Sequence, residues 1–156
     1  MLIRLIALGN KMPAWVNQGV QDYSKRLLTS CPIEIIEIPL EKRSKNQSIT
    51  RLVEKESEKI LSHLKPGNLV IALDIKGQTW STLQLAEQLK KWQTNGRNID
   101  MLIGGPEGLS PACLQKADIK WSLSPLTFPH PLVRVIMTEQ LYRAWSILQN
   151  HPYHRE

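Results

Sequence analysis

The sequence predicts an α/β fold, in which helices flank a mostly parallel β-sheet. Short apolar runs of strand length alternate with longer amphipathic stretches of helical period. The first run is almost wholly aliphatic, as expected for a strand that is buried on both faces of a parallel sheet. The predicted strands cover residues 2–8, 33–38, 69–74, 98–103 and 119–123. The helical patterns cover residues 14–27, 49–64, 81–92, a short stretch from 110, and 131–149.

Length and composition favour strands for the apolar runs. Each run is too short for a typical helix and is rich in β-branched residues. Gly9 ends the first run and Pro39 ends the second, and both residue types interrupt regular structure. The runs are spaced widely enough for a helix between most of them, which is typical of a parallel sheet.

Start and stop signals delimit the helices. Pro13 precedes the first helix, and Pro66 with Gly67 follows the second. Ser81 and Gln84 have the spacing of a capping box, while Ser110 followed by Pro111 has the pattern of a helix cap with proline at the first helical position. The last helix should bury one apolar stripe, which consists of Val133, Met137, Leu141, Ala144 and Leu148.

Size and composition predict one domain over residues 1–156 of an ordinary globular protein. The formal net charge of +6 favours nucleic acid as a partner, although excess lysine can also serve solubility alone. Cys31 and Cys113 are far apart and are expected to be free thiols of a cytoplasmic protein. Arg4 interrupts the apolar N-terminus, so we expect neither a signal peptide nor a membrane-spanning segment.

Several common enzyme signatures are missing from the sequence. There is no phosphate-binding loop that ends in Gly-Lys-Ser/Thr, and no glycine-rich dinucleotide loop follows the first strand. His151 and His154 have no zinc-ligand partners nearby in the sequence, so we predict no metal site. Ser110 does not lie in a nucleophile elbow.

Two loops late in the chain are candidates for ligand binding. Residues 102–111 end an apolar strand in Gly104-Gly105, and glycines there let backbone amides approach a ligand. Residues 121–131 contain three prolines and are apolar enough to hold a flat aromatic ring. Taken singly, the first loop is better explained as a tight turn and the second as a buried crossover connection.

Two further segments are polar. Residues 40–47 contain Lys42, Arg43 and Lys45, which predicts an exposed basic loop. The tail, residues 150–156, is rich in groups that bind phosphate, stack on bases or transfer protons. A solvated terminus is the alternative interpretation of the tail, which is too polar to contribute much to a core.

Four strings together resemble one family, the ribosomal RNA large subunit methyltransferase H family. The resemblance covers the whole chain in order and without a large gap. The strings are Gly9-Asn10-Lys11-Met12-Pro13, Leu102-Ile103-Gly104-Gly105-Pro106-Glu107-Gly108, Pro129-His130-Pro131-Leu132-Val133-Arg134 and His151-Pro152-Tyr153-His154-Arg155-Glu156.

The resemblance implies a SPOUT-class fold with a deep trefoil knot near the C-terminus, and a homodimer. The implied reaction is transfer of a methyl group from S-adenosylmethionine to a ring nitrogen, N3, of a pseudouridine in 23S ribosomal RNA. The implied partner is the assembled ribosome. An RNA-binding ribosome-assembly factor without catalytic activity is the alternative, since it would need the basic loop and tail but no cofactor pocket.

The resemblance also assigns site residues. The implied cofactor site comprises Leu73, Gly104 and the run Leu123, Ser124, Pro125, Leu126, Thr127 and Phe128. His154 is the first candidate for a general base because histidine titrates near neutral pH, and Glu156 and the terminal carboxylate compete for that role. The candidate RNA contacts are Tyr153, Arg155, Arg134 and Arg143. For the two helix arginines, an ordinary exposed helix face is the alternative.

Overall fold

The computed structural model describes residues 1–155 and forms one five-stranded sheet with helices on both faces. The strands are β1 (Ile3–Leu8), β2 (Ile33–Ile38), β3 (Leu69–Thr79), β4 (Ile99–Ile103) and β5 (Ile119–Ser122). The helices are α1 (Ala14–Ser24), the 3-10 turn η1 (Lys25–Leu27), α2 (Ile49–Ser62), α3 (Thr82–Asn95), α4 (Pro111–Lys116) and α5 (His130–Leu148).

All strand pairs of the sheet are parallel, in the order β2-β1-β4-β3-β5. The predicted fold class is therefore confirmed. β1 pairs with strands on both sides, and all its residues are buried, as its aliphatic composition predicted. Because the strands are parallel, their carboxyl ends and the loops that follow them meet at one edge of the sheet.

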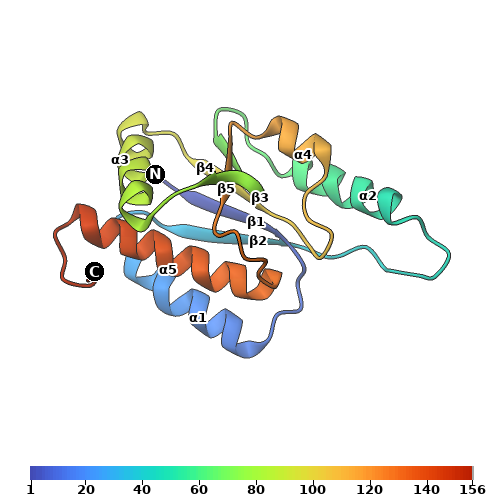
Figure 1. Cartoon of the computed structure of the whole chain (residues 1–156), viewed down its shortest axis with the longest axis horizontal. Helices are drawn as coiled ribbons and strands as arrows, with labels where there is room; N and C mark the ends of the chain where they lie inside the picture. Colours follow the sequence, from blue (N-terminus) through green and yellow to red (C-terminus); the bar gives the residue numbers. More distant parts are fainter. Residues whose placement is uncertain (156) are drawn as a thin grey trace.

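Two helical layers enclose the sheet (Figure 1). Helices α1, α3 and α5 cover one face, where α5 packs between the other two. Helices α2 and α4 cover the opposite face over a smaller apolar cluster that includes Ile60 and Cys113. No helix within residues 1–155 is long and apolar enough to cross a membrane.

The local helix signals are confirmed in detail. Ser81 accepts a hydrogen bond from the Gln84 amide while the Gln84 side chain accepts one from the Ser81 amide, which completes the capping box. The Ser110 hydroxyl caps α4, with Pro111 at its first position. The first helix is shorter than predicted, because its α-helical turns end at Ser24 and a 3-10 turn follows.

Two charged residues inside the strands are paired with each other. Arg4 of β1 and Asp100 of β4 are registered neighbours, and their side chains form a buried ion pair of 2.6 Å. Asp100 also accepts hydrogen bonds from the Lys65 amide and from Asn68. These contacts join the amino ends of the strands, and the opposite edge of the sheet carries the cavity described below.

Candidate active site

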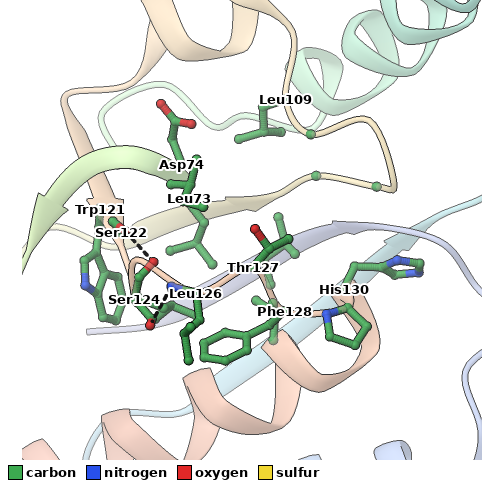
Figure 2. A pocket seen from close by; sticks show the side chains of 18 of the residues that line it. Leu73, Asp74, Leu109, Trp121, Ser122, Ser124, Leu126, Thr127, Phe128 and His130 are labelled. Atoms are coloured by element: carbon green, nitrogen blue, oxygen red, sulfur yellow. Dashed lines mark hydrogen bonds between the residues drawn. The ribbon is translucent and has the colours of Figure 1, made fainter.

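A cavity of about 570 Å³ lies at the carboxyl ends of β4 and β5, beside the middle of β3. Three segments far apart in the sequence form its walls: the middle of β3, the glycine loop after β4 and the proline loop after β5. Figure 2 shows Asp74 and Leu109 on one side of the cavity, with Leu126 and Phe128 on the other. A mostly apolar cavity of this size with a few polar groups is typical of a small-molecule site.

The glycine loop, residues 104–108, is folded tightly on itself. The Gly108 amide donates a 3.0 Å hydrogen bond to the Gly105 carbonyl, and Gly108 has a φ of +77°. A Cβ on Gly104 would lie 2.6 Å from the Gly108 carbonyl carbon. The loop's own closure therefore requires glycine at position 104, and the closed loop forms one wall of the cavity.

The proline loop, residues 123–129, is held by its own hydroxyl groups. Ser122 donates to the Ser124 carbonyl at 3.1 Å, and the Ser124 hydroxyl accepts from the Leu126 amide at 3.0 Å (Figure 2). Leu126 lies at the rim and is 69% exposed, which is unusual for so large an apolar side chain. Such an exposed leucine is suited to cover an apolar ligand.

The structure brings most of the expected cofactor residues together. The cavity lining includes Leu73, Gly104, Leu123, Ser124, Leu126, Thr127 and Phe128. Pro125, also expected there, is exposed and does not line the cavity. The geometry thus gathers the middle of β3 and the loops after β4 and β5 around one space.

Two polar residues of the cavity were not identified as site residues from the sequence. Asp74 follows Leu73 directly and contributes a carboxylate, and His130 contributes an imidazole from the start of α5. Burial, with the nearby Arg134 cation as a second cause, lowers the pKa of His130 below its usual value of 6.5, so the ring is neutral at pH 7. In the sequence, His130 belongs to one of the four strings that resemble the family, and no local pattern marks it as a residue that lines a cavity.

Arg134 does not offer its guanidinium to RNA, contrary to the expectation from sequence. Its side chain is 2% exposed and pairs with Glu37 at 2.5 Å. It also donates to the Gly9 carbonyl at 2.6 Å and to the Leu8 carbonyl at 3.3 Å. Arg134 therefore joins α5 to the ends of β1 and β2, because a buried cation must be paired and hydrogen-bonded.

The tail folds back onto α5, and its residues are not simply solvated. Tyr153 packs against the main core, donates a 3.0 Å hydrogen bond to Glu139, and lies under the Arg143 guanidinium at 4.7 Å. The expectation that the tail contributes little to a core is thus wrong for Tyr153. Burial, together with the bond to Glu139, raises the pKa of Tyr153 to about 12, so its hydroxyl stays protonated.

The other tail candidates lie near the same end of α5. His154 Nδ1 is 3.4 Å from Arg143 Nη1, and Arg143 also pairs with Glu139 at 2.7 Å. Arg155 is exposed. Glu156, the second candidate base, lies outside the described residues.

Within one chain the tail and the cavity are well separated. Val133 lines the cavity, whereas Arg143, the neighbour of His154, lies ten residues further along α5. That spacing corresponds to about 15 Å along a helix axis. A proton acceptor must come within hydrogen-bond reach of its donor, so His154 does not serve the cavity of its own chain in this arrangement.

Among residues 1–155, no three His, Cys, Asp or Glu side chains are grouped so as to hold a metal ion.

Comparisons with known proteins found structures of the same fold and one matching family. Two solved structures, described as a "probable methylase family protein" and a "putative methylase family protein", each match over 99% of this chain at 12% identity. The one from Haemophilus influenzae Rd KW20 has a TM-score of 0.56 over 70% of its length, and the one from Neisseria gonorrhoeae has 0.52 over 86%. At such low identity these likenesses show the fold alone. Residues 1–154 match the family model described as a predicted SPOUT methyltransferase. The chain belongs to the SPOUT methyltransferase family.

Proposed function

We propose that this protein uses S-adenosylmethionine to methylate N3 of a pseudouridine in 23S ribosomal RNA, acting as a homodimer on the assembled ribosome. The observation that supports this most strongly is the cavity that β3 and the loops after β4 and β5 form at one edge of the sheet. Membership of a methyltransferase family and the net charge of +6 support the reaction class and a polyanionic substrate.

The cavity residues fit S-adenosylmethionine chemically. Leu73, Leu123 and Phe128 offer apolar surface to an adenine ring, and the glycine loop offers backbone polar groups without intervening Cβ atoms. Asp74 offers a carboxylate, which suits either a ribose hydroxyl or the cationic end of the cofactor. When bound, the cofactor supplies a methyl carbon that its sulfonium already activates.

The protein's own task is to orient the acceptor and to remove its proton. The N3–H of pseudouridine lies between two carbonyls and is a poor nucleophile until the proton leaves. A general base within hydrogen-bond reach typically contributes ~10²–10⁴-fold to the rate. We assign that base to the tail, with His154 as first candidate and Glu156 as second. Tyr153 and Arg155 are the candidate contacts to base and phosphate.

A dimer would bring the tail of one subunit to the cavity of the other, since the tail is remote from its own cavity. The surface for it is the outer side of α5 with the start of α1. Leu132, Val135 and Ile136 are only half-buried and belong to neither core cluster. Trp15 of α1 is 55% exposed on the same helical layer. Apolar residues that a helix face leaves only partly covered are typical of an interface.

The test is incubation of the purified protein with ribosomes and S-adenosylmethionine that carries a labelled methyl group, followed by mapping of the modified base. We expect one labelled pseudouridine in 23S RNA. Calorimetry with the cofactor should show binding in the absence of ribosomes. If the protein binds the cofactor but labels no RNA, the proposed RNA substrate is wrong. If the protein does not bind the cofactor, an RNA-binding assembly factor is favoured instead.

A further inference from the structure

The segment between β2 and α2, residues 40–47, forms an exposed loop that we call the basic arm. It contains neither helix nor strand, and Figure 1 shows that it extends beyond the helical layers. Lys42, Arg43 and Lys45 outnumber the single carboxylate, Glu41. The sequence predicted this loop as an exposed basic segment, and only the alternative of an RNA-binding assembly factor gave it a role.

The carboxylates around the basic arm have specific cationic partners. Glu41 pairs with Lys59 at 2.6 Å. Glu56, whose side chain is 2% exposed, and Glu107 both pair with Arg43, each at 2.6 Å. Arg43 and Lys59 therefore compensate most of this negative charge, and the exposed lysines nearby outweigh the remainder.

Three lysines near the basic arm are left for an external partner. Within residues 1–155, Lys11, Lys42 and Lys45 take part in none of the ion pairs. All three are exposed. Lys11 belongs to the loop after β1, which leaves the sheet next to the basic arm, because β1 and β2 pair to their ends and the Gly9 amide donates to the Ile38 carbonyl at 2.7 Å.

These lysines lie at the same edge of the sheet as the cavity. The middle of β3 and the loops after β4 and β5 form the cavity, and the loops after β1 and β2 carry the lysines at the other half of that edge. The exposed face of α2 differs, because Arg51 and Lys55 there alternate with Glu54 and Glu58. At this end of the molecule the unpaired positive charge therefore lies on the basic arm and Lys11 rather than on α2.

Arg43 connects the basic arm physically to the cavity wall. Its Nη2 donates to Glu107 at the tip of the glycine loop, while its Nη1 donates to Glu56 of α2 and to the Glu41 carbonyl at 2.8 Å. The Leu40 side chain packs against Gly105, where an added Cβ would approach it to 3.2 Å. The basic arm therefore has a fixed position relative to the cavity at its first residues.

Building on the proposed function, we propose that Lys42 and Lys45 of the basic arm, together with Lys11, bind the RNA backbone beside the target nucleotide. The Arg43–Glu107 ion pair sets the distance from this backbone contact to the cavity. A polyanion is the partner that matches exposed cations without protein counterions. Lysine contacts with phosphates position a nucleic acid without reading its sequence, which suits a target chosen by ribosome structure.

The test compares the Lys42→Ala/Lys45→Ala double variant with a matched control, Lys90→Ala/Lys91→Ala. The control removes the same charge from two exposed lysines of α3, away from the cavity edge. Ribosome binding and methyl transfer are measured over a series of salt concentrations, with S-adenosylmethionine affinity measured by calorimetry. We expect the arm variant to raise KM for ribosomes at nearly constant kcat, and to reduce the salt slope of log K by about 0.7 for each lost lysine contact.

The control should keep the wild-type KM and slope, and both variants should keep wild-type cofactor affinity. Equal effects of the arm and control variants would overturn the proposal, because only bulk charge would then matter. A change in sedimentation with unchanged ribosome binding would overturn it too, and would assign the basic arm to a contact between two copies of this chain. If the wild-type protein neither binds cofactor nor transfers methyl groups, the proposed function fails first, which is a distinguishable result.

Discussion

Gly104 shows how one residue can serve a turn and a binding site together. The sequence offered these as alternatives, since glycine at a strand end fits both. In the structure the missing Cβ makes room for the backbone of Gly108 and Leu109, 2.6 and 2.9 Å from where that Cβ would be. The closed loop then forms a wall of the cavity. The local turn is therefore the means by which the binding surface is built.

A Gly104→Ala substitution should consequently open the glycine loop and weaken the site. We expect a folded protein whose cofactor affinity is reduced and whose rate falls on the order of 10²-fold, as displaced groups near reacting atoms typically cause. Calorimetry and methyl-transfer assays measure the two effects. Gly67→Ala is the control. Gly67 has a φ of +86°, which would strain an alanine, but no atom lies near its Cβ position. Wild-type cofactor affinity in Gly104→Ala would contradict the assignment.

His130 gives the cavity a pH dependence. Burial lowers its pKa in the folded state below the usual 6.5, so the unfolded chain binds the proton more readily. The stability associated with the neutral ring is present above pH 6.5 and is lost as the pH falls toward the folded-state pKa.

We therefore expect the free energy of unfolding to decrease below about pH 6.5, and His130→Gln to flatten that part of the profile. Denaturant titrations between pH 5 and 8, at about the same ionic strength, provide the measurement. His63→Gln is the matched control, since His63 lies at the end of α2 and does not line the cavity. An identical loss of pH dependence in both variants would show that His130 is not its source.

At the scale of elements, α5 joins two functions that the sequence placed apart. Its first turns line the cavity and its last turns hold the tail. The aromatic ring of Tyr153 packs edge-on against Tyr142, with 4.6 Å between centroids. The composition of the tail does not predict this packing. The packing depends on a turn of the chain at Asn150, which has a φ of 54°.

Deleting Tyr153 to Glu156 should accordingly have two effects. Loss of the Tyr153 ring contact and of its bond to Glu139 should destabilise the fold by about 2 kcal/mol. Methyl transfer should fall by ~10²–10⁴-fold if the base leaves with the tail. Thermal unfolding and a methylation assay at a temperature where the variant is folded separate the two effects.

Point variants resolve the tail further. Tyr153→Phe keeps the ring and removes only the hydroxyl that donates to Glu139, so stability should fall with a smaller effect on rate. His154→Ala should lower the rate and alter its pH profile near neutrality, with little change in stability. If His154→Ala keeps the wild-type rate and pH profile, His154 is not the general base. If the truncated protein methylates ribosomes normally, the tail has no role in the reaction.

Sequence predicted element positions well where the signal was local. The capping box at Ser81 and the Ser110 cap depend on residues three apart, and both are confirmed. β3 is longer than its apolar run and continues to Thr79, because pairing with β5 resumes at Gln78 after an irregularity. Polar residues in that extension carry no apolar pattern, so only the partner strand defines them as part of the sheet.

At the scale of the whole molecule, the sequence predicted a parallel sheet but not its order. β1 lies between β2 and β4, and this arrangement depends on pairings between residues nearly a hundred positions apart. The cavity depends on the same strand order. β4 and β5 must both adjoin β3, so that the loops after them meet beside the middle of β3. Resemblance to a family therefore indicated site residues that periodicity alone could not. The knot that it implied stays a prediction.

Sharing of active sites between two subunits can be tested by mixing inactive variants. In the proposed homodimer, each active site combines the cavity of one subunit with the tail of the other. A subunit with a damaged cavity can therefore still supply an intact tail to its partner. We propose mixing two inactive proteins after partial dissociation, Gly104→Ala with a damaged cavity and His154→Ala with a damaged tail. A mixed dimer then contains one site with both defects and one site with none.

Random exchange makes about half of all dimers mixed, so activity should rise to about a quarter of the wild-type rate. The outer face of α5 provides the control, because Ile136→Glu should prevent dimers and abolish this recovery as well as the activity itself. If each chain used its own tail, each chain in every mixed dimer would carry one defect, and mixing would restore nothing. The 15 Å or so of helix between Val133 and Arg143 favours the first outcome.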